Sequence, residues 1–456
     1  MATSSSHQLA DDPTKNVVIY INDYYPEYGA AFHKLAEKLG RPLKGVVLVS
    51  KALKDSGSNL SDPNGIFKEV VCDFTNDAEL RATIKQFENN LLLVSCSAER
   101  SQSDFRRVLP HIPYVLGPTE TSLLWATHKG KMRELIGAYN SKLVPKVQPV
   151  TSADDEEIQK AMNTLTFPMM IKPTGLSEAA FVTKVHDEAE LRTALRRVFG
   201  ALQEAYKRRI GNGAPGVIIE EFMDGEQYSI DCYINQNGKV WCLPLLHGKS
   251  AYHMGLEGFH TYQTESFNEL TPAEDAAGKQ AATDAMHALG LRSSLAHIEL
   301  FKMNDGSGWR IIELGARPGG MRQEVYEVSY GVDHAFNELL LKTGFDPEIN
   351  TKPLAHSMIF GIYPDAEGEV VAIEGIDEAR LHPSVRKMVQ FIKVGSRVLP
   401  STKGGTVMAH GLASHSDVEQ LRKDVKHIRS QIKVYIDEPL EERAKPASKK
   451  RPHTVA

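Results

Sequence analysis

The first quarter of the chain alternates between short apolar runs and a longer stretch with helical spacing. Runs rich in β-branched and aliphatic residues cover positions 17–21, 45–49, 69–71 and 91–94. Between the first two runs, apolar residues recur at helical spacing over residues 28–39, which end at Gly40. Strand, helix and strand in this order predict a parallel sheet covered by helices. We therefore predict an N-terminal α/β domain over residues 16–125.

The pattern changes from about residue 127 onward, where strands are interleaved with long amphipathic helices. Helical spacing covers residues 131–139, 188–208, 272–289 and 418–431. Strand-like runs cover residues 167–172, 181–185, 216–221, 357–362 and 406–410. Asp187, with Glu190 three positions later, can cap the second of these helices. This mixture predicts a second, larger α/β region rather than a repeat of the first domain.

Two hairpins are visible in the larger region. Asn237-Gly238 is a strong signal for a two-residue turn, and the resulting register sets Tyr233 opposite Cys242 and sends Cys232 to the other face. The four cysteines form no Cys-x-x-Cys pair, so we expect reduced thiols. A Gly- and His-rich stretch over residues 247–259 is predicted to be a loop.

The second hairpin brings two acids together. Apolar strands over residues 295–303 and 309–314 flank a five-residue loop. If Met303 faces Trp309, Glu299 falls directly opposite Glu313, with Cβ atoms about 4.5–5.5 Å apart. Two carboxylates so placed repel one another unless a cation lies between them, and Mg²⁺ prefers such oxygen ligands.

The alternative is a pair of solvent-facing acids on an edge hairpin. The apolar neighbours Phe301 and Ile311, which this register puts on the same face, favour the metal site.

Three basic residues are candidates for binding phosphate groups. Lys172 ends a buried-looking strand, where an ammonium group is costly unless it meets an anion. Lys129 lies at the transition between the two patterns, and Arg317 follows Glu313 in Glu-Leu-Gly-Ala-Arg-Pro-Gly-Gly. A guanidinium in this place suits an acyl phosphate or an oxyanion. A lysine snorkelling to solvent and a surface ion pair of the arginine are the structural alternatives.

Other motifs give weaker evidence of a functional site. Gly211, Gly213 and Gly216 have dinucleotide-fingerprint spacing but follow a helix and open a strand, so they predict a turn. Gly248-Lys249-Ser250 lacks the first glycine of a phosphate-binding loop. The histidines at 247, 253 and 260 fit no zinc pattern and are expected to contact substrate or solvent.

The bulk composition is typical of a globular protein with several domains. The 456 residues are 41% hydrophobic and carry a net charge of -5, which gives no basis for nucleic-acid binding. The chain shows neither a signal peptide nor an apolar run of membrane-spanning length. We expect a cytoplasmic protein without nucleic-acid or membrane partners, with disordered tails over residues 1–15 and 439–456.

In chain order, these features resemble the ATP-grasp superfamily. His128-Lys129-Gly130-Lys131-Met132-Arg133 is similar to its Asp-Lys-x-x-Met-Arg start, and Lys172 matches the second phosphate-binding lysine. The resemblance implies an adenine hinge at Glu220, Glu221 and Phe222, Mg²⁺ ligands at Glu299 and Glu313, and an arginine, Arg317, that holds the activated acyl group. Gln227 stands where relatives have a ribose-binding carboxylate.

The resemblance also implies an architecture. A two-lobed ATP-grasp domain would follow the N-terminal domain, with its small lobe, the lid, at residues 126–221 and its large lobe at 222–353. The C-terminal α/β lobe, residues 354–438, looks like that of L-amino acid ligases of the bacilysin-synthetase type, and carnosine synthases are similar.

The implied activity is ATP-dependent ligation of a carboxylate to an amine through an acyl phosphate, with two Mg²⁺ ions, for which Mn²⁺ could substitute. The substrates would be small molecules, in particular amino acids, and the assembly could be a homodimer. His253, His260 and Met321 are expected to shape the acceptor pocket. The alternatives are an ATP-grasp carboxylase subunit and an ATP-binding regulatory protein without catalysis.

Overall fold

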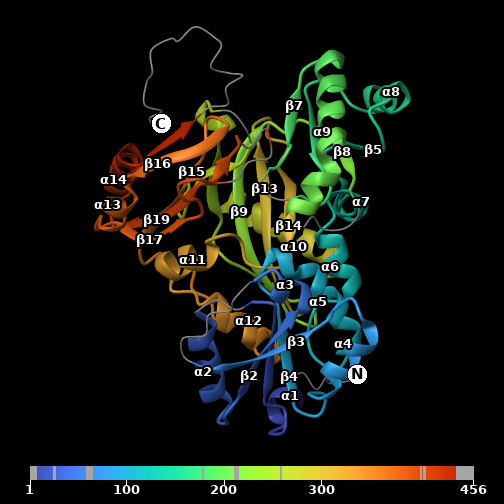
Figure 1. The fold of residues 1–456 in the computed structure, drawn as a ribbon, viewed down its shortest axis with the longest axis vertical. Helices are drawn as coiled ribbons and strands as arrows, with labels where there is room; N and C mark the ends of the chain where they lie inside the picture. Colours follow the sequence, from blue (N-terminus) through green and yellow to red (C-terminus); the bar gives the residue numbers. More distant parts are fainter. Residues whose placement is uncertain are drawn as a thin grey trace.

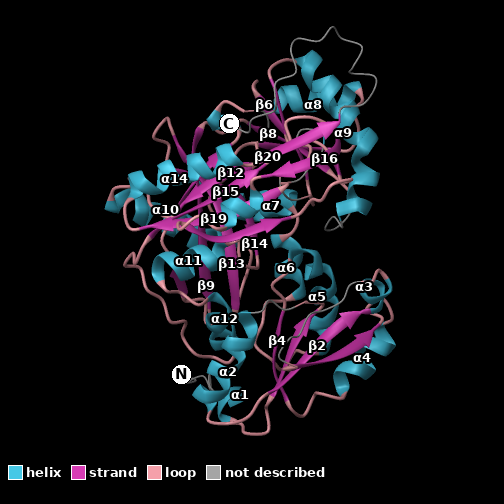
Figure 2. Cartoon of the chain, turned by 60° about the vertical axis from the view of Figure 1, so that its left-hand side comes forward, coloured by secondary structure: helices cyan, strands magenta, loops and turns pink. Residues whose placement is uncertain are grey.

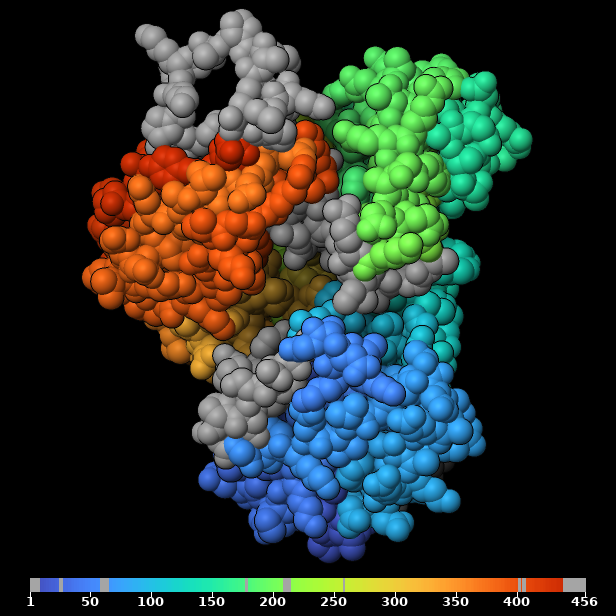
Figure 3. Space-filling model, in the orientation of Figure 1, coloured from blue at the N-terminus to red at the C-terminus, as the bar shows by residue number. Residues whose placement is uncertain are grey.

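The chain is arranged around four sheets. The computed structural model describes residues 8–23, 27–57, 65–176, 179–209, 215–256, 259–400, 403 and 407–437. The N-terminal strands lie at one end of the elongated molecule, the largest sheet lies beyond them, and the lid stands beside that sheet (Figures 1 and 2). Figure 3 shows the lid, in green, and the C-terminal strands, in orange, on opposite sides of a hollow. Every described helix is too short or too polar to cross a membrane.

The N-terminal sheet confirms the predicted parallel α/β arrangement. Its strands lie in the order β3-β2-β1-β4, and all three pairings are parallel. The strands are β1 (Val17–Ile21), β2 (Lys44–Ser50), β3 (Phe67–Cys72) and β4 (Leu91–Ser95). The helices of this part are α2 (Glu27–Leu39), α3 (Lys51–Asp55), α4 (Asp77–Lys85), α5 (Gln102–Val108) and α6 (Glu120–Ala126). A short helix α1 (Gln8–Asp11) lies within the segment predicted to be a disordered tail, so that prediction was wrong for these four residues.

The lid is a separate antiparallel sheet in the order β5-β8-β6-β7. Its strands are β5 (Val147–Val150), β6 (Met169–Pro173), β7 (Thr183–Val185) and β8 (Val217–Glu221), with helices α8 (Asp155–Thr164) and α9 (Glu188–Arg209). Asp187 caps α9 as predicted, since its carboxylate accepts from the Glu190 backbone N–H at 2.9 Å. The strand predicted from Phe181 begins only at Thr183, because Phe181 has a left-handed φ of 58° that a strand cannot contain.

The largest sheet has nine strands and runs through both the large lobe and the C-terminal lobe. The main path is β14-β13-β9-β11-β12-β15-β19-β17, and β10 pairs with β9. The strands are β9 (Gly225–Ile234), β10 (Val240–Cys242), β11 (Leu246–Ser250), β12 (Thr261–Glu265), β13 (Ser294–Met303), β14 (Trp309–Gly315), β15 (His356–Ile362), β17 (Val385–Gln390) and β19 (Ala409–His415). Two predictions change here: the loop expected from His247 begins as a strand, and the strand expected at 406–410 starts at Ala409.

A small fourth sheet completes the C-terminal part. Its strands β16 (Gly368–Glu374), β18 (Arg397–Val398) and β20 (Lys433–Asp437) pair in the order β18-β16-β20. The helices here are α13 (Ile376–Arg380) and α14 (Val418–Gln431). The apolar face of α14 packs through Leu421, Val425 and Ile428 into a core shared with β15 and β19.

Strict alternation along β9 and β13 gives the large sheet two different faces. Ile230 and Ile298 point into a core formed with α7 (Lys129–Tyr139) and α10 (Pro272–Ala288). The opposite face carries Asp231, His297 and Glu299 on the same two strands. Helices α11 (Arg322–Tyr330) and α12 (His334–Lys342) cover one end of that opposite face through a second apolar core. The other end carries the candidate site.

The Asn-Gly hairpin has a different register from the predicted one. Asn235 N–H donates to Lys239 O at 3.1 Å, so three residues rather than two form the loop, and Gly238 takes a left-handed φ of 84°. The shift by one position pairs Trp241 with Tyr233 and Cys242 with Cys232. The prediction that the two cysteines lie on different faces was therefore wrong.

The acidic hairpin contains the predicted pair of glutamates, but the register of its two strands differs from the predicted one. Glu299 is opposite Glu313, as expected, but Lys302 rather than Met303 is opposite Trp309. An irregularity after Glu299 absorbs one residue of β14, because Leu300 then faces Ile311. Ile311 is consequently buried in the helix-covered core, and Ile312 takes the position beside the glutamates that had been assigned to Ile311.

Candidate functional site

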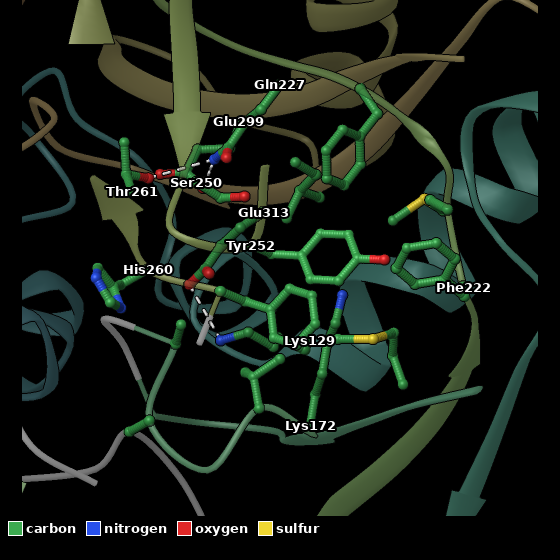
Figure 4. A pocket seen from close by; sticks show the side chains of 18 of the residues that line it. Lys129, Lys172, Phe222, Gln227, Ser250, Tyr252, His260, Thr261, Glu299 and Glu313 are labelled. Atoms are coloured by element: carbon green, nitrogen blue, oxygen red, sulfur yellow. Dashed lines mark hydrogen bonds and ion pairs between the residues drawn. The ribbon is translucent and has the colours of Figure 1, made fainter. Parts of the chain in front are cut away.

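A pocket with about 980 Å³ of empty space, part of it open solvent, lies between the lid and the polar face of the large sheet (Figure 4). Side chains from β6 and the segment after it form one wall, and β9, β13 and β14 form the other. The residues that line it from both sides include Lys129, Met170, Lys172, Phe222, Gln227, Tyr252, His253, His260, Glu299, Phe301, Ile312 and Glu313.

The paired glutamates are the acidic end of this pocket. The side chain of Glu299 is 27% exposed and that of Glu313 is 39% exposed, so both reach the pocket. Gln227, on β9, donates to Glu299 at 3.4 Å and to Thr261 at 3.3 Å. Direct pairing across the two strands places both carboxylates on one face, where a dication could accept oxygens from each.

Two lysines approach this acidic end from the lid side. Lys129 begins α7, where His128 caps the helix through its Nδ1, and its Nζ lies 3.2 Å from Glu313 Oε1. Lys129 also donates to Leu176 O at 2.7 Å, within the segment that follows β6. Lys172, the fourth residue of β6, points into the pocket but pairs with Glu220 at 2.6 Å. Both ammonium groups are buried and lie where phosphate oxygens would meet them.

Glu220 lies beneath the pocket and does not line it. Its carboxylate is 0% exposed and accepts from Arg133 Nε and Lys172 Nζ, both at 2.6 Å. Burial alone would raise the pKa of Glu220, but the two cations outweigh burial and lower it to about 2. Burial likewise lowers the pKa of Lys172 despite the attraction of Glu220. The Glu220 side chain thus forms an internal ion pair that holds Lys172 in place. The sequence had not predicted this contact.

The predicted hinge divides after Glu220. Phe222 and Met223 line the pocket, whereas Glu221 is exposed and does not. On the opposite wall Tyr252 receives a hydrogen bond from Lys184 of the lid at 2.9 Å. The Lys184 ammonium also lies 3.7 Å from the centre of the Phe222 ring, a cation–π contact. These aromatic and apolar groups form a slot suited to a flat base.

Arg317 lies beside the acidic end but outside the pocket lining. Its Nε donates to Glu99 of the N-terminal domain, and its Nη1 donates to Pro318 O at 2.7 Å. Burial opposes the charge, yet Glu99 and then Glu313 raise the pKa of Arg317. The sequence analysis did not predict a role for Glu99, since its partner Arg317 lies 218 positions away in the chain.

A buried polar chain supports Glu299 from behind and was also missed. Asp231 is 0% exposed and its Oδ1 accepts from His297 Nδ1 at 2.6 Å. His297 Nε2 in turn lies 3.5 Å from Glu299 Oε1. Burial would lower the pKa of His297, but the Asp231 carboxylate prevails and raises it. His334 Nε2 lies 3.2 Å from the other Asp231 oxygen, and its Nδ1 contacts the Tyr233 hydroxyl.

The three predicted acceptor-pocket residues do not lie together. His253 lines the pocket and its Nδ1 is 2.8 Å from Ser250 Oγ. His260 also lines it, with its ring centre 3.7 Å from that of Tyr363. Met321 lies elsewhere: it precedes α11 with a left-handed φ of 56° and packs against the apolar core under that helix. Met321 therefore does not line this pocket, and its role in binding the acceptor stays a prediction.

The donors present fit a hard divalent cation that also binds phosphate. Among the described residues, no group of three or more His, Cys, Asp or Glu side chains could enclose a metal by itself. Two carboxylates on adjacent strands, open to a pocket with two lysines, are the arrangement in which Mg²⁺ takes its remaining ligands from phosphate and water.

Two family models match the chain. An ATP-grasp domain matches residues 165–324, and L-amino acid ligase C-terminal domain 2 matches residues 361–437. The first range contains Lys172, Glu299, Glu313 and Arg317. The chain therefore carries an ATP-grasp domain followed by the C-terminal domain of an L-amino acid ligase. With the fold described above, these two matched domains make the chain similar to ATP-grasp proteins, a resemblance that the sequence predicted.

Similar proteins agree with this fold. An L-amino acid ligase from Bacillus licheniformis superimposes with a TM-score of 0.74 over 94% of this chain and 100% of that chain, at 20% identity. A phosphoribosylamine–glycine ligase of Methanosphaera stadtmanae is 27% identical over 120 residues, which are 26% of this chain and 26% of that protein. An uncharacterised protein of Sinorhizobium fredii is 21% identical over 62% of this chain and 55% of its own length. Both sequence matches thus cover less than two thirds of those relatives.

Proposed function

We propose that this protein uses ATP to join the carboxylate of one amino acid to the amine of another, through an acyl phosphate, and releases ADP and phosphate. The observation that carries the proposal is the direct pairing of Glu299 with Glu313 in a pocket that also contains Lys129 and Lys172. The L-amino acid ligase C-terminal domain supports amino acids as the substrates.

Each residue has a defined part in the proposed reaction. The slot around Phe222 and Tyr252 takes the adenine, and Lys129 and Lys172 offset the charge of the phosphates. Glu299 and Glu313 would hold Mg²⁺, as two ions or one, and the bound metal would neutralise charge on the transferred phosphoryl group.

The carboxylate of the first substrate attacks the γ-phosphorus, the bond to the ADP oxygen breaks, and an acyl phosphate forms. The amine of the second substrate then attacks the acyl carbon and expels phosphate, while its surplus proton passes to solvent. Arg317, whose positive charge is stabilised by Glu99 and Glu313, would hold the acyl group by charge-assisted hydrogen bonds. The lid, held at Tyr252 by Lys184, would keep water from the acyl phosphate.

The test is a phosphate-release screen with ATP, Mg²⁺ and pairs of amino acids, with products identified by mass spectrometry. We expect at least one pair to give a dipeptide and equal amounts of phosphate. Glu313→Gln should reduce release at least about a hundredfold, the scale of losing a preorganised charge at a reacting phosphate. Glu378→Gln, a change of an exposed acid on α13, is the matched control and should leave the rate unchanged.

Two results would refute the proposal. One is wild-type turnover of the Glu313→Gln variant with the fold intact by circular dichroism. The other is phosphate release that responds to bicarbonate but to no amino acid pair, which would indicate an ATP-grasp carboxylase instead.

A further inference from the structure

The register of the Asn-Gly hairpin brings two thiols into contact. Cys232 on β9 lies directly opposite Cys242 on β10, and their Sγ atoms are 3.3 Å apart. The flanking Leu243 N–H donates to Asp231 O at 3.1 Å. Because hydrogen-bonded and non-hydrogen-bonded pairs alternate along an antiparallel ladder, the cysteines occupy a non-hydrogen-bonded pair, where facing side chains are closest.

The two thiols differ in ways that suit sequential chemistry. Cys232 is 0% exposed, and burial raises its pKa well above the usual value. Cys242 is only partly buried, and its Sγ lies 3.7 Å from Thr283 Oγ1. The hydrogen bond from Cys232 lowers the pKa of Cys242, whereas burial raises it. The hydrogen bond of Thr283 and the charge of Lys279 also lower it, so the net shift is downward. The outer thiol, Cys242, is therefore partly exposed and has a lowered pKa, and the inner thiol, Cys232, is shielded but in contact with it.

We propose that Cys232 and Cys242 form a thiol–disulfide exchange site for a low-molecular-weight disulfide. The Cys242 thiolate attacks one sulfur of that disulfide, which makes a mixed disulfide and releases one small thiolate. Cys232 then loses its proton, attacks Cys242 Sγ and expels the second small thiolate. Two protein thiols are oxidised, one small disulfide is reduced to two thiols, and no other reactant is required.

The local structure permits the bond to close. A disulfide has an S–S distance of about 2.05 Å, so the sulfurs must approach by about 1.3 Å. Among the strands that the structure describes, β10 pairs with β9 alone, so its other edge carries no strand that would resist this movement. The remaining cysteines, Cys72 and Cys96, are buried in the N-terminal domain and serve as internal controls.

The experiment uses the full chain, folded, with oxidised glutathione as the probe. After incubation, alkylation of free thiols and digestion with trypsin, cleavage at Lys239 separates the two cysteines, so a disulfide appears as a linked peptide pair. We expect two of the four thiols to be lost under native conditions. The Cys232→Ser variant should stop at a glutathione adduct on Cys242, the Cys242→Ser variant should not react, and Cys72→Ser should behave as wild type.

Retention of all four thiols in the folded wild-type chain would overturn the proposal. So would adducts confined to Cys72 or Cys96. The wild-type peptide map decides the question even if a serine variant fails to fold. The result is also independent of the proposed ligase activity, because the assay contains neither ATP nor amino acids.

Discussion

The buried histidine behind Glu299 gives the sharpest prediction for the proposed metal site. His297 uses its two ring nitrogens for two different partners: Nδ1 meets Asp231 at 2.6 Å and Nε2 lies 3.5 Å from Glu299. Asparagine reproduces the position of Nδ1 and glutamine that of Nε2. His297→Asn therefore keeps the donor to Asp231 and removes the one near Glu299, whereas His297→Gln does the opposite.

Two effects of His297→Asn oppose each other. Loss of an imidazolium near Glu299 removes repulsion of a bound cation, which would strengthen binding. That repulsion is small, because Asp231 at 2.6 Å makes the pair electrically neutral toward the pocket. Loss of the group that orients a metal-binding carboxylate weakens affinity about 10–100-fold. Orientation should prevail, at about 1.4–2.8 kcal/mol of metal-binding free energy.

The assay measures phosphate release against Mg²⁺ concentration at saturating ATP and amino acids. We expect His297→Asn to raise the Mg²⁺ concentration for half-maximal rate at least about tenfold, and His297→Gln to raise it less. Thermal unfolding of both variants controls for the buried position. If both variants lose stability equally while the Mg²⁺ dependence of His297→Asn matches wild type, the histidine supports the fold alone and the reasoning fails.

Two further predictions concern the ion pair beneath the pocket and the contact across its mouth. The lowered pKa of Glu220 means that its contribution to folding is fully present above the unfolded value of 4.5 and is lost as the pH falls toward about 2. Thermal unfolding of wild type should show this acid loss. Glu220→Gln, which strands Arg133 and Lys172, should lower stability by about 3–5 kcal/mol at neutral pH; an unchanged melting temperature would contradict it. Tyr252→Phe removes only the hydrogen bond from Lys184, so the KM for ATP should rise less than about tenfold, whereas Tyr252→Ala should raise it more. Equal KM values for ATP in the two variants would show that the aromatic ring of Tyr252 does not contact the nucleotide.

The carboxylate pair could be predicted from the sequence because the register of a hairpin depends only on residues that are close together in the chain. Period-two alternation and a short loop restrict the register of a hairpin to a few values, and Glu299 opposite Glu313 was one of them. The loop of this hairpin is one residue shorter than predicted, and the bulge in β14 compensates for the difference at the glutamate pair. The sequence pattern does not indicate either change. For the same reason the prediction for Cys232 and Cys242 was wrong. A three-residue turn replaces the predicted two-residue turn, and no bulge restores the predicted register.

The supporting residues were missed for a different reason. Asp231 and His297 are 66 positions apart in sequence and become neighbours only through the pairing of β9 with β13. Glu99 reaches Arg317 from another domain. Alternation can show that such residues share a face, but it cannot show which strand lies beside which. Long-range register therefore limits how much of the site a sequence can specify.

Accessibility and partner charge separate the structural glutamate of this region from the candidate metal ligands. Glu220 is fully buried and already meets two cations at 2.6 Å, so its negative charge is balanced and closed to a ligand. Glu299 and Glu313 are partly exposed, and their nearest basic groups lie at 3.5 and 3.2 Å. A dication entering the pocket would gain two incompletely neutralised carboxylates at the cost of loosening only weak contacts. The carboxylate of Glu220 therefore supports Lys172, while the hinge role that the resemblance implies for this segment stays a prediction. Of these three acids, Glu299 and Glu313 are the two able to bind metal.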